Sequence, residues 1–390
     1  MRLGIIASHP VQYQVPLFRE LARRCDVRVL FAHRATPADH AASGFNVAFD
    51  WDIDLTSGFE HSFLENVARH PGLERFWGCD TPHVGAELRQ FAPDSILLMG
   101  WHLKCYWQSI GAAHRLGVPV MVRGDSQLET PRGILKRAGK AALYPVALRS
   151  FDAALYVGER SRRYFEHYKY PKDRQFFSPH CVDNEWFSTR ATNEAGSRLR
   201  ESLGIASGAV VALFAGKLVP FKQPIDLIEA AGQCRADGKI VEVMVAGSGE
   251  LELEIRRRAA ELRVPLHILG FCNQTEMPPA YAAADMLVLP SSVETWGLVV
   301  NEALACGRPV IVSDACGCAP DLAADARVGR VFPSGDTRAL AREMRSLLGA
   351  LPSSARIMEQ ARKFSVSASA DGILAAALAV GSSSRCRVET

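Results

Sequence analysis

The sequence predicts an α/β protein made of two Rossmann-like, doubly wound domains that face a cleft. Short apolar runs end in Gly, Ser, Asp or Pro, and stretches with helical periodicity follow them along the whole chain. Near-continuous apolar strands that alternate with helices are typical of parallel sheets covered on both faces. The length of 390 residues leaves room for two or three domains.

The first half of the chain opens with a strand, because its first apolar run is too short for a signal peptide and ends in a polar turn. Helical stretches are expected at 16–24 and 106–116, between apolar runs. The predicted strands of this half are 3–7, 27–32, 95–99, 118–123 and 153–157.

The second half repeats the alternation after a break at 188–208, where polar and small residues interrupt the apolar pattern. We therefore predict a first domain over 1–187 and a second over 188–363. The predicted strands of the second domain are 210–215, 242–246, 266–269, 286–289 and 309–312, and its predicted helices are 224–236, 251–262, 277–284 and 298–306. Open sheets of this kind bind ligands at the carboxyl ends of their strands, so the cleft is the expected site.

Composition excludes several classes of function. There are 45 Lys and Arg residues against 42 Asp and Glu, a net charge of +3, which is too small a surplus to predict a nucleic-acid partner. No apolar run approaches the roughly 20 residues of a membrane-spanning helix. The ten cysteines contain no Cys-x-x-Cys pair, so no zinc site is expected and a cytoplasmic enzyme is the plain interpretation.

The most informative segment is 290–311, where a predicted strand ends in a loop and a helix starts near Gly297. The backbone N–H groups of Gly297, Leu298 and Val299 have no partner within such a helix, and this end suits a phosphate. Glu294 lies in the loop, and Glu302 lies about one turn inside the helix. Two carboxylates beside a phosphate repel it unless they contact hydroxyls, and sugar or ribose hydroxyls are the obvious candidates.

The two acids form a Glu-x7-Glu motif that resembles the retaining glycosyltransferases of family 4, which have the GT-B fold. Further similar segments follow in the family's order, at 180–187, 214–224, 245–250 and 269–271. The resemblance covers nearly all of 150–335. It implies a nucleotide-diphosphate sugar donor of UDP or GDP type, retention of the anomeric configuration, and a last helix at about 364–380 that crosses back onto the first domain.

The resemblance also implies roles for individual residues. Lys217 and Lys222 hold the diphosphate, Glu302 bonds the ribose, and Glu294 contacts the transferred sugar. Phe271 and Cys272 lie near the base. The remaining donor-binding positions are backbone sites: Gly216, Gly247, Gly297, Leu298 and Val299. Lys217 replaces the commoner Arg, so a bidentate fork becomes a point charge.

The first domain is expected to set the acceptor. His9, Gln12 and Tyr13 follow the first strand and are polar candidates for the cleft, with Trp101 after a later strand. Many relatives place a His after the strand at 118–123, and two acceptor-side positions lie there in this chain. Asp125 occupies the place of that His, with Arg123 beside it, and Asp125 joins Glu294, Lys222 and Lys217 as an expected catalytic group.

The segment 131–149 is basic and amphipathic. Its cations, Arg132, Lys136, Arg137 and Lys140, alternate with apolar residues. Such a segment can lie on an anionic membrane, so peripheral contact with the inner membrane surface stays open beside a solvated helix face.

The expected reaction is transfer of a sugar to a hydroxyl-bearing glycan, lipid-linked or small-molecule acceptor. No Asp-x-Asp motif appears, and lysines can replace a divalent ion, so we expect neither a metal nor another cofactor. Two other classes remain open: a nucleotide-sugar epimerase of similar fold, and a binding protein without turnover.

Overall fold

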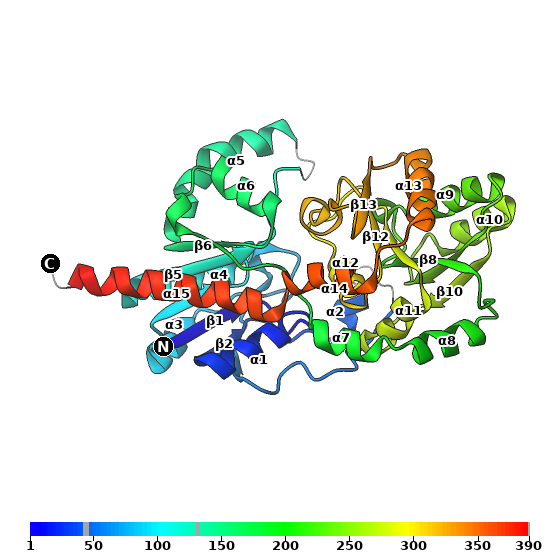
Figure 1. The fold of residues 1–390 in the computed structure, drawn as a ribbon. Helices are drawn as coiled ribbons and strands as arrows, with labels where there is room; N and C mark the ends of the chain where they lie inside the picture. Colours follow the sequence, from blue (N-terminus) through cyan, green and yellow to red (C-terminus); the bar gives the residue numbers. More distant parts are fainter. Residues whose placement is uncertain (42–46, 130–132, 389–390) are drawn as a thin grey trace. The chain divides into compact units, whose positions relative to one another are not determined.

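The computed structural model describes the chain except for residues 42–46, 130–132 and 389–390 (Figure 1). It divides into two compact units. The first comprises Met1–Thr36, Asp54–His180 and Val366–Thr390, and the second comprises Pro37–Ile53 and Cys181–Ser365. The predicted division did not include the early contribution of Pro37–Ile53 to the second unit.

The first unit contains a seven-stranded parallel sheet with the order β3-β2-β1-β4-β5-β6-β7. The order reverses between β1 and β4, which is where open α/β sheets leave a crevice for ligands. The elements of this unit are β1 (Arg2–Ala7), α1 (Val15–Arg24), β2 (Asp26–Phe31), β3 (Glu60–Phe63), α3 (Val84–Phe91), β4 (Ser95–Leu98), α4 (Lys104–Leu116), β5 (Val120–Gly124), α5 (Ile134–Ala147), β6 (Ala153–Tyr156), α6 (Glu159–His167), β7 (Gln175–Phe177) and α15 (Val366–Val388).

Helices cover both faces of this sheet. Apolar residues of α3, α4 and α6 pack against one face, with Tyr106 and Tyr164 among the largest buried side chains. On the other face α1 and α15 pack together, and Phe18 and Ile373 are fully buried there. The continuous apolar strands are explained by this double burial, since neither face of the sheet meets water.

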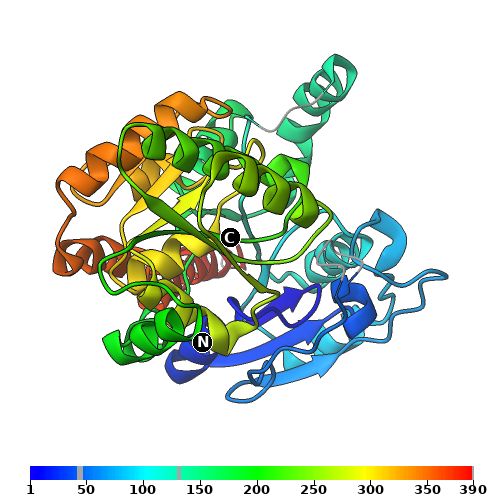
Figure 2. The same cartoon turned by 90° about the vertical axis from the view of Figure 1, so that its right-hand side faces the viewer.

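The second unit contains a six-stranded parallel sheet with the order β10-β9-β8-β11-β12-β13, which reverses between β8 and β11 (Figures 1 and 2). Its elements are α2 (Pro37–His40), α7 (Asn184–Arg190), α8 (Asn193–Ser202), β8 (Val210–Ala215), α9 (Pro224–Ala236), β9 (Val241–Ala246), α10 (Glu252–Leu262), β10 (Leu266–Gly270), α11 (Met277–Ala283), β11 (Met286–Leu289), α12 (Leu298–Ala305), β12 (Val310–Ser313), β13 (Gly329–Phe332), α13 (Thr337–Gly349) and α14 (Ser354–Arg362).

The second sheet is also covered on both faces. Helices α9, α10 and α13 bury Leu227, Ile255 and Met344 against one face. The chain crosses from β11 to β12 in the opposite direction along the sheet, so right-handed crossovers place α12 on the other face. There α12 packs with α7 and α14, and α11 packs with α8. The predicted fold class, two Rossmann-like parallel sheets, is therefore confirmed.

Two details differ from the sequence prediction. The stretch 188–208, interpreted as a break, is mostly helical, because the polar helix α8 packs closely on α11 through a glycine. A Cβ at Gly196 would lie 2.6 Å from the carbonyl oxygen of Ala282. The sheets are also wider than predicted. Their edge strands β3, β7 and β13 carry polar or half-exposed residues and lack the apolar signature of the central strands.

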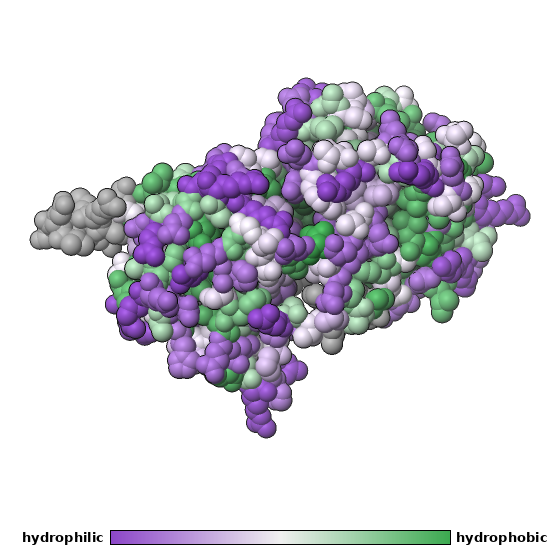
Figure 3. Space-filling view, turned by 90° about the horizontal axis from the view of Figure 1, so that it is seen from below, coloured by the Kyte–Doolittle hydropathy of each residue, from purple (hydrophilic) through white to green (hydrophobic). Residues whose placement is uncertain are grey.

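Hydrophilic residues cover much of the face drawn in Figure 3, with hydrophobic residues between them. Within the described part of the chain, no helix is both long enough and apolar enough to cross a membrane.

Candidate active site

The predicted donor-side residues of the second unit follow its two central strands. Lys217 comes directly after β8, and Lys222 lies in a short 3₁₀ turn, Pro220–Lys222, a few residues later. Glu294 lies in the loop after β11. Since β8 and β11 are hydrogen-bonded neighbours where the strand order reverses, three charged side chains converge on the expected ligand crevice of this sheet.

An ion pair joins two of these groups across 72 positions of sequence. The Lys222 ammonium donates to the Glu294 carboxylate, and both side chains are largely buried, with 18% and 14% of their surface exposed. Lys217 lies within electrostatic reach of both. Burial and the neighbouring Lys222 lower the pKa of Lys217, while Glu294 acts in the opposite direction. The cluster therefore carries two cations and one anion, a net positive charge beside the crevice.

Glycines allow the backbone to close around this cluster. Gly216 has a φ of +148°, and its N–H donates to the Ala246 carbonyl at 2.9 Å. A Cβ at Gly247 would lie 1.8 Å from the Gly216 carbonyl oxygen, so no other residue fits there. The two predicted glycine positions therefore pack against each other at the ends of β8 and β9.

Helix α12 begins at Leu298, as the sequence predicts, and Gly297 precedes it with a φ of +105°. A Cβ at Gly297 would come within 2.8 Å of Leu289. The first N–H groups of a helix have no acceptor within the helix, so the N–H groups of Leu298 and Val299 are of the kind that binds an anion. This helix start follows the same loop that carries Glu294.

Glu302 lies one turn inside α12 and accepts a hydrogen bond of 2.6 Å from the Tyr281 hydroxyl. Burial raises the pKa of Glu302 to about 7, although the tyrosine hydrogen bond acts the other way. Burial and Glu302 together raise the pKa of Tyr281 well above its usual value. Sequence reasoning missed Tyr281, because a tyrosine in an Ala-rich helix signals only core packing.

The segment Cys316-Gly317-Cys318 packs against the Glu294 loop. Gly317 N–H donates to the Glu294 carbonyl, and Cys318 N–H donates to the Trp296 carbonyl, each at 3.0 Å. A Cβ at Gly317 would lie 1.9 Å from the Thr295 carbonyl oxygen. Both thiols are buried and reduced, so these cysteines act as small loop residues that fix the backbone around Glu294.

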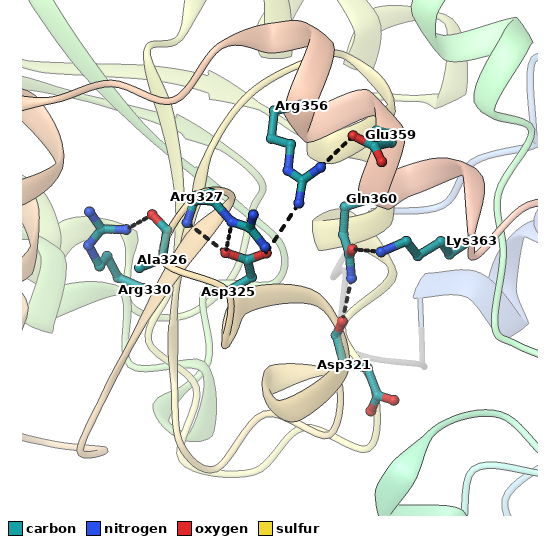
Figure 4. Close-up of polar contacts among 9 residues, drawn as sticks. All are labelled: Asp321, Asp325, Ala326, Arg327, Arg330, Arg356, Glu359, Gln360 and Lys363. Carbon is teal, nitrogen blue, oxygen red and sulfur yellow. Dashed lines mark hydrogen bonds and ion pairs between the residues drawn. The ribbon is translucent and has the colours of Figure 1, made fainter.

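A polar network holds the chain that follows this segment (Figure 4). Asp325 accepts from Arg327 and faces Arg356 of α14, which also pairs with Glu359. Gln360 of α14 donates to the Asp321 carbonyl at 2.8 Å. These contacts fasten α14 to the chain between β12 and β13, and so support the loop behind Glu294.

The predicted base-side residues, Phe271 and Cys272, come just after β10 and meet an unexpected partner. The ring of Phe49 lies 4.2 Å from that of Phe271, centroid to centroid. Burial raises the pKa of Cys272 to about 12. The only sequence signal for this contact is the alternation of aromatic and acidic residues at 49–52, which is too short to specify a partner.

In the first unit, the acceptor-side candidates follow the central strands of the other sheet. Nδ1 of His9 lies 3.0 Å from the Ser8 hydroxyl, just after β1. Gln12 and Tyr13 are half-buried in the turn before α1. Burial is the main cause of a raised pKa at Tyr13, and the nearby Asp125 raises it further. The structure thus brings Tyr13 close to Asp125, which follows β5.

Sequence reasoning missed a histidine in this cluster. Nε2 of His180 lies 3.9 Å from the Asp125 carboxylate, and its ring meets the Tyr13 ring edge-on at 6.0 Å. Burial lowers the pKa of His180, while Asp125 opposes the shift. Burial also lowers the pKa of His102, which follows β4, and Asp125 again opposes the shift. Asp125 therefore has an imidazole beside it, although the position after its strand lacks one.

Two other acceptor-side candidates have packing partners in the structure. Arg123 is buried and donates to the Ser178 and Pro179 carbonyls and to the Ser178 and Ser369 hydroxyls. Its guanidinium thus ties β5 to the end of β7 and to α15. The ring of Trp101 packs among three aromatic side chains: Tyr144, Phe151 and Tyr164.

Within the described ranges, no three His, Cys, Asp or Glu side chains are grouped as a metal ion would require. The positive charge at the end of β8 comes from lysines.

Comparison with known proteins identifies the family. The family model described as "Glycosyl transferases group 1" matches residues 197–364. A D-inositol 3-phosphate glycosyltransferase of Corynebacterium glutamicum is 31% identical over 288 residues, which cover 70% of this chain and 67% of that protein. The chain belongs to the group 1 glycosyl transferases.

Other relatives of this group 1 glycosyltransferase match over a shorter length. A GDP-mannose-dependent monoacylated alpha-(1-6)-phosphatidylinositol monomannoside mannosyltransferase of C. glutamicum is 33% identical over 177 residues, 44% of this chain and 46% of that protein. The matches to several curated relatives span about a third to a half of those proteins.

Among solved structures, Anabaena Alr3699/HepE in complex with UDP matches the group 1 glycosyltransferase with a TM-score of 0.73 and 18% identity. The match covers 96% of this chain and 98% of that one. At this identity the likeness shows the fold, which is the GT-B arrangement of two Rossmann-like sheets.

Proposed function

We propose that this group 1 glycosyltransferase moves a sugar from a UDP or GDP sugar to a hydroxyl-bearing acceptor, with retention of configuration. The observation that carries the proposal is the convergence of Lys217, Lys222, Glu294 and the start of α12 at the ends of β8 and β11. Cations and unpaired amides suit a diphosphate, and the carboxylates suit hydroxyls. Similar proteins are named for such donors: the Anabaena structures hold UDP or UDP-glucose, and the Corynebacterium enzyme is named as GDP-mannose-dependent.

In this proposal the donor's diphosphate lies against Lys217, Lys222 and the amides of Leu298 and Val299. As the bond between sugar and phosphate breaks, negative charge grows on the phosphate, and preorganised cations stabilise it. When the diphosphate binds, the Lys222 ammonium is shared between the phosphate and Glu294. The Glu294 carboxylate then accepts hydrogen bonds from the transferred sugar and offsets the positive charge that develops on the sugar ring.

Glu302 and Tyr281 would hold the ribose, since a half-buried carboxylate beside a hydroxyl offers both acceptor and donor. We propose that the lysines take the place of a divalent ion, so that no metal or other cofactor is needed. On the first unit, Asp125, His180 and Tyr13 would form the acceptor side, with His9 and Gln12 nearby. Arg123 and Trp101 would support this cluster by packing.

The experiment is to incubate the purified protein with UDP and GDP sugars, with and without a panel of hydroxyl acceptors. Release of nucleoside diphosphate that depends on the acceptor, with an unchanged anomeric configuration in the product, supports the proposal. Inversion of the configuration would remove the retaining assignment. Conversion of the donor into an isomer without acceptor would mean an epimerase, and binding without turnover would mean a binding protein.

We also propose that the enzyme is cytoplasmic and makes peripheral contact with an anionic membrane through α5. Three large apolar side chains of this helix are strongly exposed, with 84% of Ile134, 67% of Leu143 and 64% of Val146 accessible. The helix sequence also carries Lys136, Arg137 and Lys140, and basic amphipathic helices bind anionic lipids. Arg132, another cation of the predicted segment, lies outside the described residues.

Co-sedimentation with vesicles tests this contact. We expect binding to vesicles rich in phosphatidylglycerol and little binding to neutral ones. Leu143→Ser combined with Val146→Ser should reduce it severalfold, while Leu378→Ser on α15, which is 62% exposed, should not. Equal binding by both variants would show that α5 is an ordinary solvated helix.

A further inference from the structure

The loop after β10 is held by a short segment from much earlier in the sequence. This loop, 270–276, begins at Gly270 with a φ of +76° and contains a short 3₁₀ turn, Gln274–Glu276. The earlier segment, 49–52, belongs to the second unit, although the chain on either side of Pro37–Ile53 belongs to the first. The loop that the donor's base is proposed to meet is therefore in contact with the N-terminal half of the sequence.

Three residues of the loop, Phe271, Asn273 and Thr275, contact segment 49–52. Phe271 packs against the buried ring of Phe49, which in turn meets the Trp51 ring edge-on at 5.1 Å. The Asn273 amide donates to the Asp50 carbonyl at 2.8 Å.

The third anchor is Asp52. Its carboxylate accepts from the Thr275 N–H at 3.1 Å and from the Thr275 hydroxyl. Its own N–H donates to the Asn273 side-chain oxygen at 3.4 Å. Contacts within the loop add to these, since Asn273 N–H donates to the Glu276 carboxylate at 2.7 Å.

The anchored loop lies beside the proposed ribose pair. Helix α11 begins at Met277, directly after the loop, and carries Tyr281, whose hydroxyl donates to Glu302. A nucleobase is bonded directly to its ribose, so a ribose at Glu302 brings the base to the loop that carries Phe271 and Cys272. Backbone groups that recognise a base edge must be placed within about half an ångström.

We propose that segment 49–52 positions loop 270–276 for recognition of the donor's nucleobase, and so sets the preference between a uracil and a guanine nucleotide. The inference rests on the proposed function, which supplies the nucleotide. Phe49 and Asp52 are positioning residues, since they contact the loop rather than the base. The alternative is that the segment only packs, with no effect on which base binds.

The experiment measures, by calorimetry on the full chain, the dissociation constants of UDP, GDP and inorganic pyrophosphate. Pyrophosphate has no base, so it reports the phosphate site alone. Phe49→Ala should bring the ratio of the UDP and GDP constants about tenfold closer to one, with pyrophosphate binding unchanged. Phe49→Tyr should keep the wild-type ratio, because it retains the ring.

Asp52→Ala is the second variant, and it removes an exposed carboxylate whose loss should leave folding intact. It should shift the ratio in the same direction, by about threefold. Trp77→Ala, which removes an aromatic residue of the first unit that is 68% exposed, should leave all three constants unchanged.

An unchanged ratio in both Phe49→Ala and Asp52→Ala would overturn the inference. A parallel loss of affinity for all three ligands would also overturn it, because that pattern means general disturbance of the unit. If the wild-type protein binds pyrophosphate but neither nucleotide, the proposed function fails first, and the inference fails with it.

Discussion

The two units share a strand order, to which the first adds a seventh strand at one edge, but they differ in the charged groups at the point where the order reverses. In the second unit, Lys222 after β8 pairs with Glu294 after β11, and the pair lies beside close-packed glycines. In the first unit, the Arg123 guanidinium at the end of β5 is buried against carbonyls and hydroxyls. Asp125, two residues later, has 43% of its side chain exposed.

Under the proposed function, this difference lets the same topology serve two kinds of ligand. The second unit offers net positive charge and helix amides, which suit a multiply charged phosphate. The first unit offers an aspartate flanked by imidazole and phenol groups, which suits neutral hydroxyls. Fold alone would not separate these roles, so the side chains at the strand ends must.

The largest expected effect is on Lys222. Lys222→Ala should lower turnover by roughly 10²–10³, the scale of losing one preorganised charge stabiliser. It also leaves the largely buried Glu294 without its cation. Steady-state kinetics measures the loss, and Lys239→Ala, an exposed lysine of the same unit, is the control. Wild-type turnover in Lys222→Ala would remove the diphosphate assignment.

The two acids of the second unit should separate in kinetics. Glu294→Gln should lower kcat by roughly 10²-fold, because the amide keeps the shape but loses the charge that offsets the positive sugar ring. Glu302→Gln should instead weaken binding of the free nucleoside diphosphate. Calorimetry with the diphosphate and kinetics with the full donor resolve the two. Equal weakening of the diphosphate by both variants would contradict this division of roles.

The first unit should show a different separation, between activity and stability. Asp125→Asn should lower turnover about tenfold and leave thermal unfolding unchanged, because its side chain is partly exposed. Arg123→Met should lower the free energy of unfolding by about 2 kcal/mol or more, because buried carbonyls lose their donor. Thermal melts and kinetics on both variants test this. If Asp125→Asn destabilised the protein as much as Arg123→Met, Asp125 would be a structural residue.

Glu302 should also make stability depend on pH. Its carboxyl has a pKa of about 7 in the fold against 4.5 in an ordinary environment, so the fold disfavours the ionised form. Stability is therefore lost as pH rises from about 4.5 through 7, by up to about 3 kcal/mol. Glu302→Gln keeps an acceptor for Tyr281 and lacks this loss. The melting temperature of the variant should exceed that of the wild type by several degrees at pH 8 and match it near pH 5. A constant difference would contradict the raised pKa.

The smallest expected effect is that of a chelator. EDTA should leave the transferase rate within about twofold, because the proposed function places lysines, and no metal ion, against the phosphate in the second unit. Full dependence of the rate on added magnesium or manganese would contradict this comparison, because a metal ion and not the lysines after β8 would then neutralise most of the phosphate charge.

Much of the fold could be predicted from the sequence because buried parallel strands are almost purely apolar. The strands at 210–215 and 286–289 were placed to the residue for that reason. Edge strands and the polar helix α8 were missed, because their stability comes from contacts rather than from a pattern. Arg200 of α8, for example, donates to the Ala283 and Ala209 carbonyls and pairs with Asp285.

The site divides in the same way. Lys217, Lys222, Glu294 and Glu302 lie within motifs, so their sequence positions were visible. Tyr281 lies outside those motifs, and His180 begins the similar segment 180–187 without any spacing that links it to Asp125. Only the folded chain brings these two residues to Glu302 and Asp125. Phe49 was invisible for a stronger reason, since its contact with Phe271 joins positions more than 200 residues apart.

Because Pro37–Ile53 belongs to the second unit, it determines where the chain can be truncated to isolate that unit. A fragment that starts at Cys181 would contain every strand of the second sheet, yet Asn273 and Thr275 would have lost the residues they bind. Such a fragment would lack the contacts of Phe49, Asp50 and Asp52 with the loop after β10. A synthetic peptide spanning 47–53, added in trans, would supply the missing contacts and complement the fragment.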